Sequence, residues 1–339
     1  MWKQPYFVIG FSIIAFFLAG SFVYEWIWGN VPRQIYYIME GGRAVEGAPI
    51  SPNWQFPLGS DEFGYDLVGK LMLGAKYTIL AALAVGALRM LIAVPLGYIL
   101  GTYLDKHRKW ISSLADSMHY IPLTLFAAFV LTPVLWMPQE GFTNTIWERI
   151  GIQVVIMALL TVPIVAILIA NEAALLRDKE FILAAKTLGA GRLRIIRKHL
   201  YPQMREKIAV LYGQQVMETF IVFAHLGLLK LFLGGTKVSY DPLFGDPPMS
   251  ISYEWAGLFG STFRYLQSAP WLPLAPVLFI GLTIFAVSMM MEGYLRSKNP
   301  KVKKLRKAKV EEPVVEWNRE QLRNNMVRIK EQEMIKAEK

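Results

Sequence analysis

Polar side chains interrupt two long apolar runs, and they are the first residues to consider for chemistry inside a membrane. Arg89 lies in the middle of one run, and Gln214, Gln215 and Glu218 lie in another. Ionisable groups are costly in a bilayer and usually face the interior of a helix bundle or a water path. One hypothesis is that these residues line a translocation path. The alternative is structural: Arg89 pairs with Glu218, or its side chain reaches to the membrane surface.

Other kinds of site have little support in the sequence. The 339-residue chain contains no cysteine, which excludes disulfides, thiolate metal sites, iron–sulfur clusters and cysteine nucleophiles. Its four histidines form no H-E-x-x-H pair. Residues 64–71 nearly match a phosphate-binding P-loop, but Leu71 replaces the hydroxyl residue that would ligate Mg²⁺. We therefore expect no catalytic, cofactor or metal site, and no ATP hydrolysis by this chain itself.

The apolar runs predict an all-α, polytopic membrane protein. Apolar residues make up 54% of the chain, and charged residues only 18%, against roughly 25% in soluble domains. Runs of about 20 apolar residues are long enough to span a bilayer. Six transmembrane helices are predicted, at roughly 6–28, 78–102, 112–136, 152–176, 207–228 and 272–293. The fifth is the least apolar because it carries Gln214, Gln215 and Glu218.

The distribution of Lys and Arg predicts the orientation of these helices. Three lie in residues 103–111, nine in 177–207 and fourteen from residue 294 onward. The alternate segments are poorer, with four in 29–77, one in 137–151 and three in 229–271. Because cytoplasmic loops are enriched in these residues, both termini are predicted to be cytoplasmic. The net charge of +10 therefore comes mostly from the predicted cytoplasmic segments and indicates the orientation in the membrane. We expect a lipid bilayer rather than nucleic acid as the partner.

These spans divide the chain into parts of different character. The parts are a first transmembrane helix (1–30), an extracytoplasmic segment (31–77), a transmembrane core (78–293) and a basic cytoplasmic tail (294–339). Residues 229–271 form a second outer segment, which we expect to cap the outer mouth. The pattern over 314–338 predicts a charged helix in the tail, either solvated near lipid headgroups or docked on a partner.

The cytoplasmic segment 177–203 has the composition of a helical hairpin. Its first helix carries four residues at helical spacing, namely Phe181, Ala184, Ala185 and Leu188. Gly189 ends that helix, a second helix follows, and Pro202 opens the fifth span, where its missing N–H costs little. A structured hairpin is unusual for a simple connection. Its apolar face could pack on its own helix ends or on another protein, and an ordinary surface loop is the alternative.

The spacing of Ala184-Ala185, Gly189 and Pro202 resembles the E-A-A-x3-G loop of bacterial ABC importer permeases. Four further segments resemble the C-type permease of the dipeptide, oligopeptide and nickel group: residues 59–66 (GSDEFGYD), 71–79 (LMLGAKYTI), 96–122 and 292–300 (EGYLRSKNP). The likeness covers about 55–300. The chain departs from the pattern at Leu183, where the motif has Glu, and at Tyr201, where it has Leu.

This resemblance implies a type I ABC importer permease fold and a peptide as the solute. It implies that the hairpin is a coupling helix that fits a groove on the ATPase. The implied partners are a homologous B-type permease subunit, two ABC ATPase subunits and an extracytoplasmic substrate-binding protein, in a bacterial or archaeal cell membrane. An ion-coupled secondary transporter is the alternative, although paired interrupted spans are not visible. An intramembrane enzyme is less favoured, because no nucleophile–base pair stands out.

Overall fold

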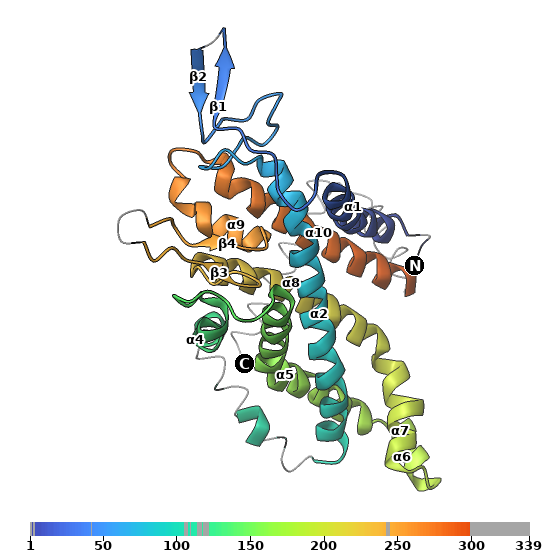
Figure 1. Cartoon of the computed structure of the whole chain (residues 1–339). Coiled ribbons are helices and arrows are strands. Elements are labelled where there is room, and N and C mark those ends of the chain that lie inside the picture. Colours follow the sequence, from blue (N-terminus) through green and yellow to red (C-terminus); the bar gives the residue numbers. More distant parts are fainter. Residues whose placement is uncertain are drawn as a thin grey trace, which may run out of the picture. The chain divides into compact units, whose positions relative to one another are not determined.

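A computed structural model describes residues 2, 4–41, 43–104, 108, 110–113, 117, 122–241 and 245–298. The chain forms two compact units, Met1–Leu295 and Arg296–Lys339. Most of the second unit, including the predicted helix at 314–338, lies outside the described residues. The first unit is built almost entirely from helices (Figure 1).

Within the described residues, four helices are long and apolar enough to cross a membrane. They are α1 (Pro5–Trp28), α2 (Leu67–Thr102), α5 (Ile146–Arg177) and α10 (Trp271–Lys298). These helices confirm the all-α, polytopic prediction. The predicted span 112–136 corresponds to α4 (Leu123–Leu135), a shorter apolar helix, and several residues before it are not described. The predicted span 207–228 corresponds to α8 (Tyr201–Leu228), which is long enough but too polar to meet the same criterion.

The second predicted span was wrong at its start, because α2 begins at Leu67 and not near residue 78. The additional turns contain Lys70 and Lys76, which lower the local hydropathy. Both side chains are buried in ion pairs, Lys70 with Asp61 and Lys76 with Glu25. Paired cations can be buried where single ones cannot. The helix therefore extends through a stretch that looks too polar to span.

The helices α2 and α5 pack closely together and run in the same direction. A Cβ atom at Gly97 would lie 2.6 Å from Ile169, and one at Gly101 would lie 2.5 Å from the carbonyl of Ala170. The glycines at these two positions of α2 therefore allow the two helices to approach closely. With 32 residues, α5 is about 48 Å long, more than the roughly 30 Å of a hydrocarbon core. One end of this pair therefore extends into water.

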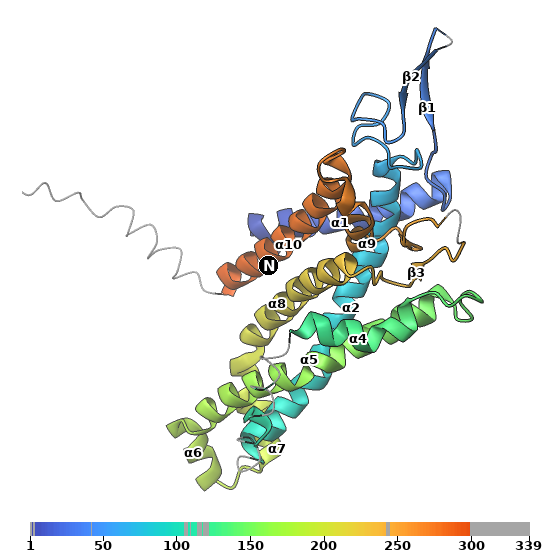
Figure 2. The same cartoon turned by 90° about the vertical axis from the view of Figure 1, so that its left-hand side faces the viewer.

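Short elements lie at the two ends of this unit. At one end are a hairpin of β1 (Tyr37–Glu40) and β2 (Arg43–Gly47), and a two-residue pairing of β3 (Thr236–Lys237) with β4 (Met249–Ser250). Helix α9 (Trp255–Thr262) and the 3₁₀ turn η2 (Phe263–Tyr265) follow. The other end carries α6 (Glu180–Thr187), α7 (Arg192–Ile195) and the π-helical turn η1 (Ile196–Leu200) (Figure 2).

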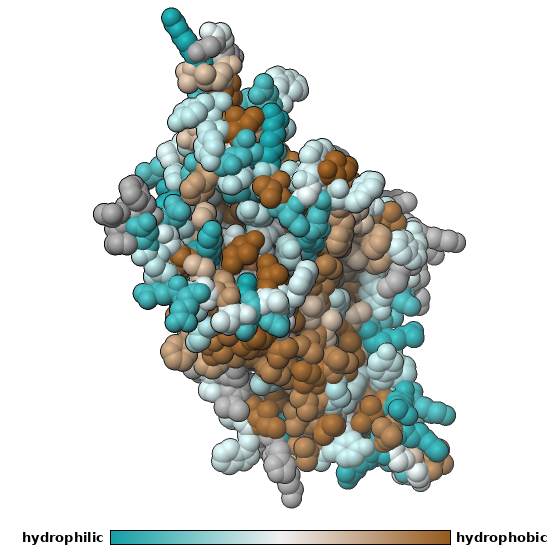
Figure 3. Space-filling model, in the orientation of Figure 1, coloured by the Kyte–Doolittle hydropathy of each residue, from teal (hydrophilic) through white to brown (hydrophobic). Residues whose placement is uncertain are grey.

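Hydrophobic residues gather on the surface between these two ends. Figure 3 shows an apolar area over the middle of the unit, with hydrophilic surface near the β-hairpin and near α6 and α7. Many large apolar side chains on the helices are exposed there, among them Leu91 (73%) and Leu278 (64%). Exposed apolar surface of this extent fits contact with lipid or with other membrane subunits.

Candidate functional site: the cytoplasmic hairpin and a buried polar cluster

The predicted hairpin is present, and its turn has the geometry that requires glycine. Gly189 has φ of 80°, in the left-handed region, and follows the end of α6. Its N–H donates to the carbonyl of Lys186 (2.9 Å), and the N–H of Ala190 donates to that of Ala185 (3.0 Å). This is the Schellman arrangement that closes many helices. The prediction of Gly189 as the helix breaker is therefore confirmed.

The hairpin packs on the ends of α2 and α5 through buried side chains from both of its arms. Ile182, Ile195 and Leu200 are at most 3% exposed, in a cluster that includes Leu100 of α2 and Ala173 of α5. Burial of such side chains contributes about 1.5–3 kcal/mol each. The guanidinium of Arg177 also donates to the carbonyl of Gly101, at 3.2 Å. The hairpin is thus fixed to two of the spans.

The predicted hairpin residues lie mainly on the opposite, outward face. Phe181 is 42% exposed and Leu188 is 88% exposed; Ala184 is exposed and Ala185 half-buried. Two partners were considered for the apolar face of the hairpin: its own helix ends and another protein. The helix ends are covered by Ile182, Ile195 and Leu200. On the outward face, the ring of Phe181 lies 6.4 Å from that of His199 in the second arm of the hairpin, whereas Leu188 remains almost fully exposed. An exposed apolar face at the end of a rigid element is typical of a docking surface.

Pro202 is the second residue of α8, as predicted, but α8 continues directly from the second arm of the hairpin. Residues 192–228 run through α7, η1 and α8 without a break. The N–H of Tyr201 donates to the carbonyl of Ile196, five residues back, and Pro202 follows directly. A widened turn accommodates a residue that lacks an N–H. The second arm of the hairpin is therefore a direct extension of α8.

Three of the four polar residues predicted inside the spans meet in one cluster. The Arg89 guanidinium donates to Gln215 Oε1 at 2.6 Å and to the carbonyl of Met157 at 3.3 Å. It lies 3.5 Å from a carboxylate oxygen of Glu218. The Arg89 side chain is 1% exposed, whereas that of Glu218 is 44% exposed. Arg89 is thus buried and does not reach to the membrane surface, and its partner carboxylate faces an open side.

Gln214 is not part of this cluster. It lies on the exposed side of α8, in a shallow groove lined also by Leu168 and Lys207. Adjacent positions on a helix point about 100° apart, so Gln214 and Gln215 cannot both face Arg89.

The motif at residues 59–66, which was predicted to be extracytoplasmic, folds into the start of α2. Asp61 accepts hydrogen bonds from the N–H groups of Phe63 (3.0 Å) and Tyr65 (2.8 Å), and its other oxygen pairs with Lys70. Asp66 caps α2 by accepting from the N–H of Val68, at 3.1 Å. The motif therefore closes a tight turn and ends the aqueous segment on a capped helix.

Comparison with known proteins shows which family the chain belongs to. Residues 93–304 match the family described as binding-protein-dependent transport system inner membrane component. This region covers well over half of the chain and includes the hairpin and two members of the buried polar cluster, Gln215 and Glu218, whereas Arg89 lies four residues before it. The chain belongs to this family, and it is a multi-pass permease of the plasma membrane.

Individual relatives match most of the chain. The dipeptide transport system permease protein DppC of Alkalihalophilus pseudofirmus is 26% identical over 292 residues, which is 86% of each protein. The glutathione transport system permease protein GsiD of Pectobacterium atrosepticum is 26% identical over 77% of this chain and 76% of its own. The di/tripeptide transport system permease protein DppC of Pseudomonas aeruginosa is 26% identical, covering 78% and 75%.

Proposed function

We propose that this chain is one permease subunit of an ATP-driven importer of peptides. Its family and its relatives' names support a transport permease, and those names include dipeptide and di/tripeptide systems. In this proposal the chain itself is not an enzyme. A homologous B-type permease subunit completes the path, two ATPase subunits supply energy, and an extracytoplasmic binding protein delivers the solute.

The observation that carries the proposal is the two-sided hairpin. Ile182, Ile195 and Leu200 fix it to the spans, while Phe181, Ala184 and Leu188 are left outward. A docked ATPase would cover the outward face. Movement of the ATPase would then reach α8 directly, because α7, η1 and α8 are continuous, and α5 through the short connection at Asp178 and Lys179.

The small residues of the outward face fit close docking. Ala184 and Ala185 leave space for a partner surface near the helix backbone, and Gly189 allows the chain to reverse direction directly after them. Leu183 is 48% exposed, so this hairpin offers an apolar group where the family motif has a carboxylate. We propose that the partner surface is correspondingly apolar at this position.

We also propose that the polar cluster borders the translocation path. Arg89 holds Gln215 and Glu218 from the buried side, and Glu218 presents its half-exposed carboxylate on the other. Contact with a buried arginine fixes the orientation of this exposed carboxylate. Such a group would contact a passing solute without forming a tight pocket.

The test of coupling uses two glycines of the same turn. Gly189 requires positive φ, so Gly189→Pro breaks the hairpin, whereas Gly191 has φ of −65°, which proline adopts. We expect Gly189→Pro to abolish ATP-driven uptake while the protein stays in the membrane, and Gly191→Pro to retain most of it. A bulky residue at Ala185 should also abolish uptake. Normal uptake by Gly189→Pro contradicts the proposal.

A further inference from the structure

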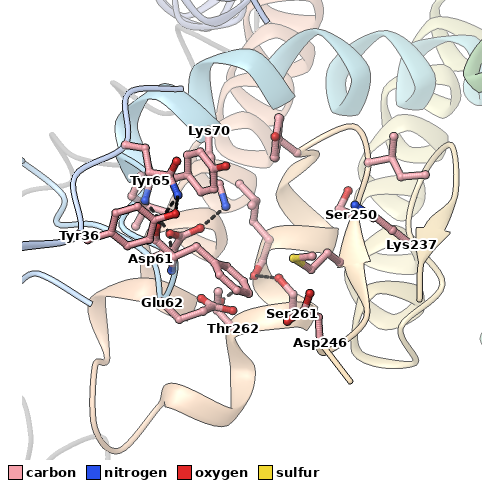
Figure 4. Close-up of a pocket in the computed structure, with 17 residues that line it drawn as sticks. Tyr36, Asp61, Glu62, Tyr65, Lys70, Lys237, Asp246, Ser250, Ser261 and Thr262 are labelled. Atoms are coloured by element: carbon pink, nitrogen blue, oxygen red, sulfur yellow. Dashed lines mark hydrogen bonds and ion pairs between the residues drawn. The ribbon is translucent and has the colours of Figure 1, made fainter. Parts of the chain in front are cut away.

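A cavity of about 420 Å³ opens on the extracytoplasmic side of the protein. Its walls come from the segment before β1, the start of α2, the β3–β4 pair and α9 (Figure 4). The volume is in the range of sites that bind small molecules. Neither the hairpin nor the buried polar cluster contributes to it.

One side of the cavity favours a cation. Glu62 lines it with a side chain only 13% exposed, and its nearest cation, Arg264, is 3.6 Å away and half-exposed. Burial raises the pKa of Glu62, whereas the charges of Lys70 and Arg264 lower it. Ser261 and Thr262, which also line the cavity, are the last residues of α9.

The wall of the cavity already binds one ammonium group, that of Lys70, and shows which side chains can surround such a group. The Lys70 ammonium pairs with Asp61 and lies 4.8 Å from the ring centre of Tyr65 and 5.3 Å from that of Tyr253. A carboxylate with aromatic faces is a common arrangement for ammonium recognition. Because Asp61 is neutralised by Lys70, two lining carboxylates remain for a ligand, Glu62 and Asp246, and Glu62 is the more buried of the two.

The other side of the cavity carries a cation. Lys237 of β3 is exposed, and no ion pair of its side chain occurs within the described residues. Figure 4 shows Lys237 and Ser250 across the cavity from Glu62. The cavity thus has a cation, Lys237, opposite the carboxylate of Glu62, and the exposed Asp246 is also in its lining.

We propose that this cavity binds a short peptide by its charged ends, with the α-ammonium at Glu62 and the carboxylate at Lys237. The proposal rests on the proposed function as a peptide importer. It adds a step in which the permease itself selects for free peptide termini before the solute enters the membrane.

The test measures binding of trialanine without ATP, to the full chain with its co-purifying subunits in lipid nanodiscs. Calorimetry compares trialanine with its N-acetyl form, which lacks the ammonium, and its C-terminal amide, which lacks the carboxylate. We expect each blocked peptide to bind about tenfold more weakly or worse, since a hydrogen bond to a charged group contributes about 1.5–3 kcal/mol. Glu62→Gln should weaken trialanine but not N-acetyl-trialanine. Glu140→Gln, exposed and outside the cavity, is the matched control.

Equal binding of free and N-acetylated trialanine, or no saturable binding, overturns the proposal. If Glu62→Gln fails to fold, the comparison of the peptides on the unaltered protein still decides. Failure of the proposed function would give a different result: no ATPase subunit co-purifies with the chain, whether or not the peptide binds. ATP-driven uptake with no discrimination between the peptides removes only this inference.

Discussion

The most informative single substitution is Leu188→Ala, because the outward face of the hairpin predicts opposite effects on stability and on docking. Leu188 is 88% exposed, so we expect its truncation to change the free energy of unfolding by no more than about 0.5 kcal/mol. Ile182, one turn and a half earlier, is fully buried. Ile182→Ala should lower the free energy of unfolding by about 2–5 kcal/mol.

Leu188→Ala should have a large effect on docking of the ATPase, although its effect on stability is small. If a partner buries Leu188, its loss removes about 1.5–3 kcal/mol of apolar burial. This corresponds to a dissociation constant for the ATPase subunits that is roughly 10- to 100-fold larger, which means weaker binding. Leu266→Ala is the control, because Leu266 is 43% exposed and follows η2 at the other end of the unit.

The assay combines two measurements on the permease in nanodiscs: titration of purified ATPase subunits and thermal unfolding. We expect Leu188→Ala to unfold as the parent does but to bind ATPase at least tenfold more weakly. Unchanged ATPase affinity for Leu188→Ala would refute the assignment of this face as the docking surface.

Three further predictions concern the spans and the outer segment. Glu218→Gln should leave the amount of folded protein unchanged but alter the uptake rate for cationic against anionic peptides; identical rates argue for a purely structural pair. Gly260→Val should lower thermal stability by more than the roughly 1–3 kcal/mol of ordinary overpacking, since a Cβ there would lie 1.9 Å from the carbonyl of Gly227; an unchanged melting temperature contradicts this packing. Burial raises the pKa of Glu254 to about 7 from 4.5. The folded state therefore holds its proton more tightly, and stability should fall by roughly 3 kcal/mol as pH rises from 4.5 to 7; Glu254→Gln should lack this part of the slope in unfolding measured against pH.

The membrane character of the chain was predictable because apolar runs report directly on bilayer spans. Four of these runs correspond closely to α1, α2, α5 and α10. The start of α2 was missed because hydropathy counts Lys70 and Lys76 as exposed charges. Their partners, Asp61 and Glu25, are 9 and 51 residues away, and no local pattern predicts such pairs.

The hairpin shows the limit of spacing arguments in another way. The 3.6-residue period identified a helix around Phe181 and Leu188, and Gly189 marked its end. Period alone does not say which apolar stripe packs inward, and Ile182 lies only one position from Phe181. The answer depends on where α2 and α5 end, which is tertiary information. The same holds for Gln214 and Gln215, since only contact with Arg89 separates their roles.

The outer segments were the least predictable part of the fold. The β3–β4 pair consists of two residues on each side, too short for a strand pattern to register. Helix α9 has eight residues and is positioned by contacts from distant parts of the chain. The Trp255 N–H donates to Thr78 Oγ1 at 3.0 Å, and its indole donates to the carbonyl of Leu71 at 2.8 Å. These contacts, rather than local propensity, also build the cavity.

Co-purification from native membranes tests the central claim most directly. The full chain carries an affinity tag, the membranes are extracted in mild detergent, and every associated protein is identified and quantified. We expect a related permease in equal amount together with two ATPase subunits. From the Leu188→Ala variant, we expect the ATPase subunits to be lost while the two permeases stay together. A lone chain or homo-oligomer that transports solute without any ATPase would contradict the central claim.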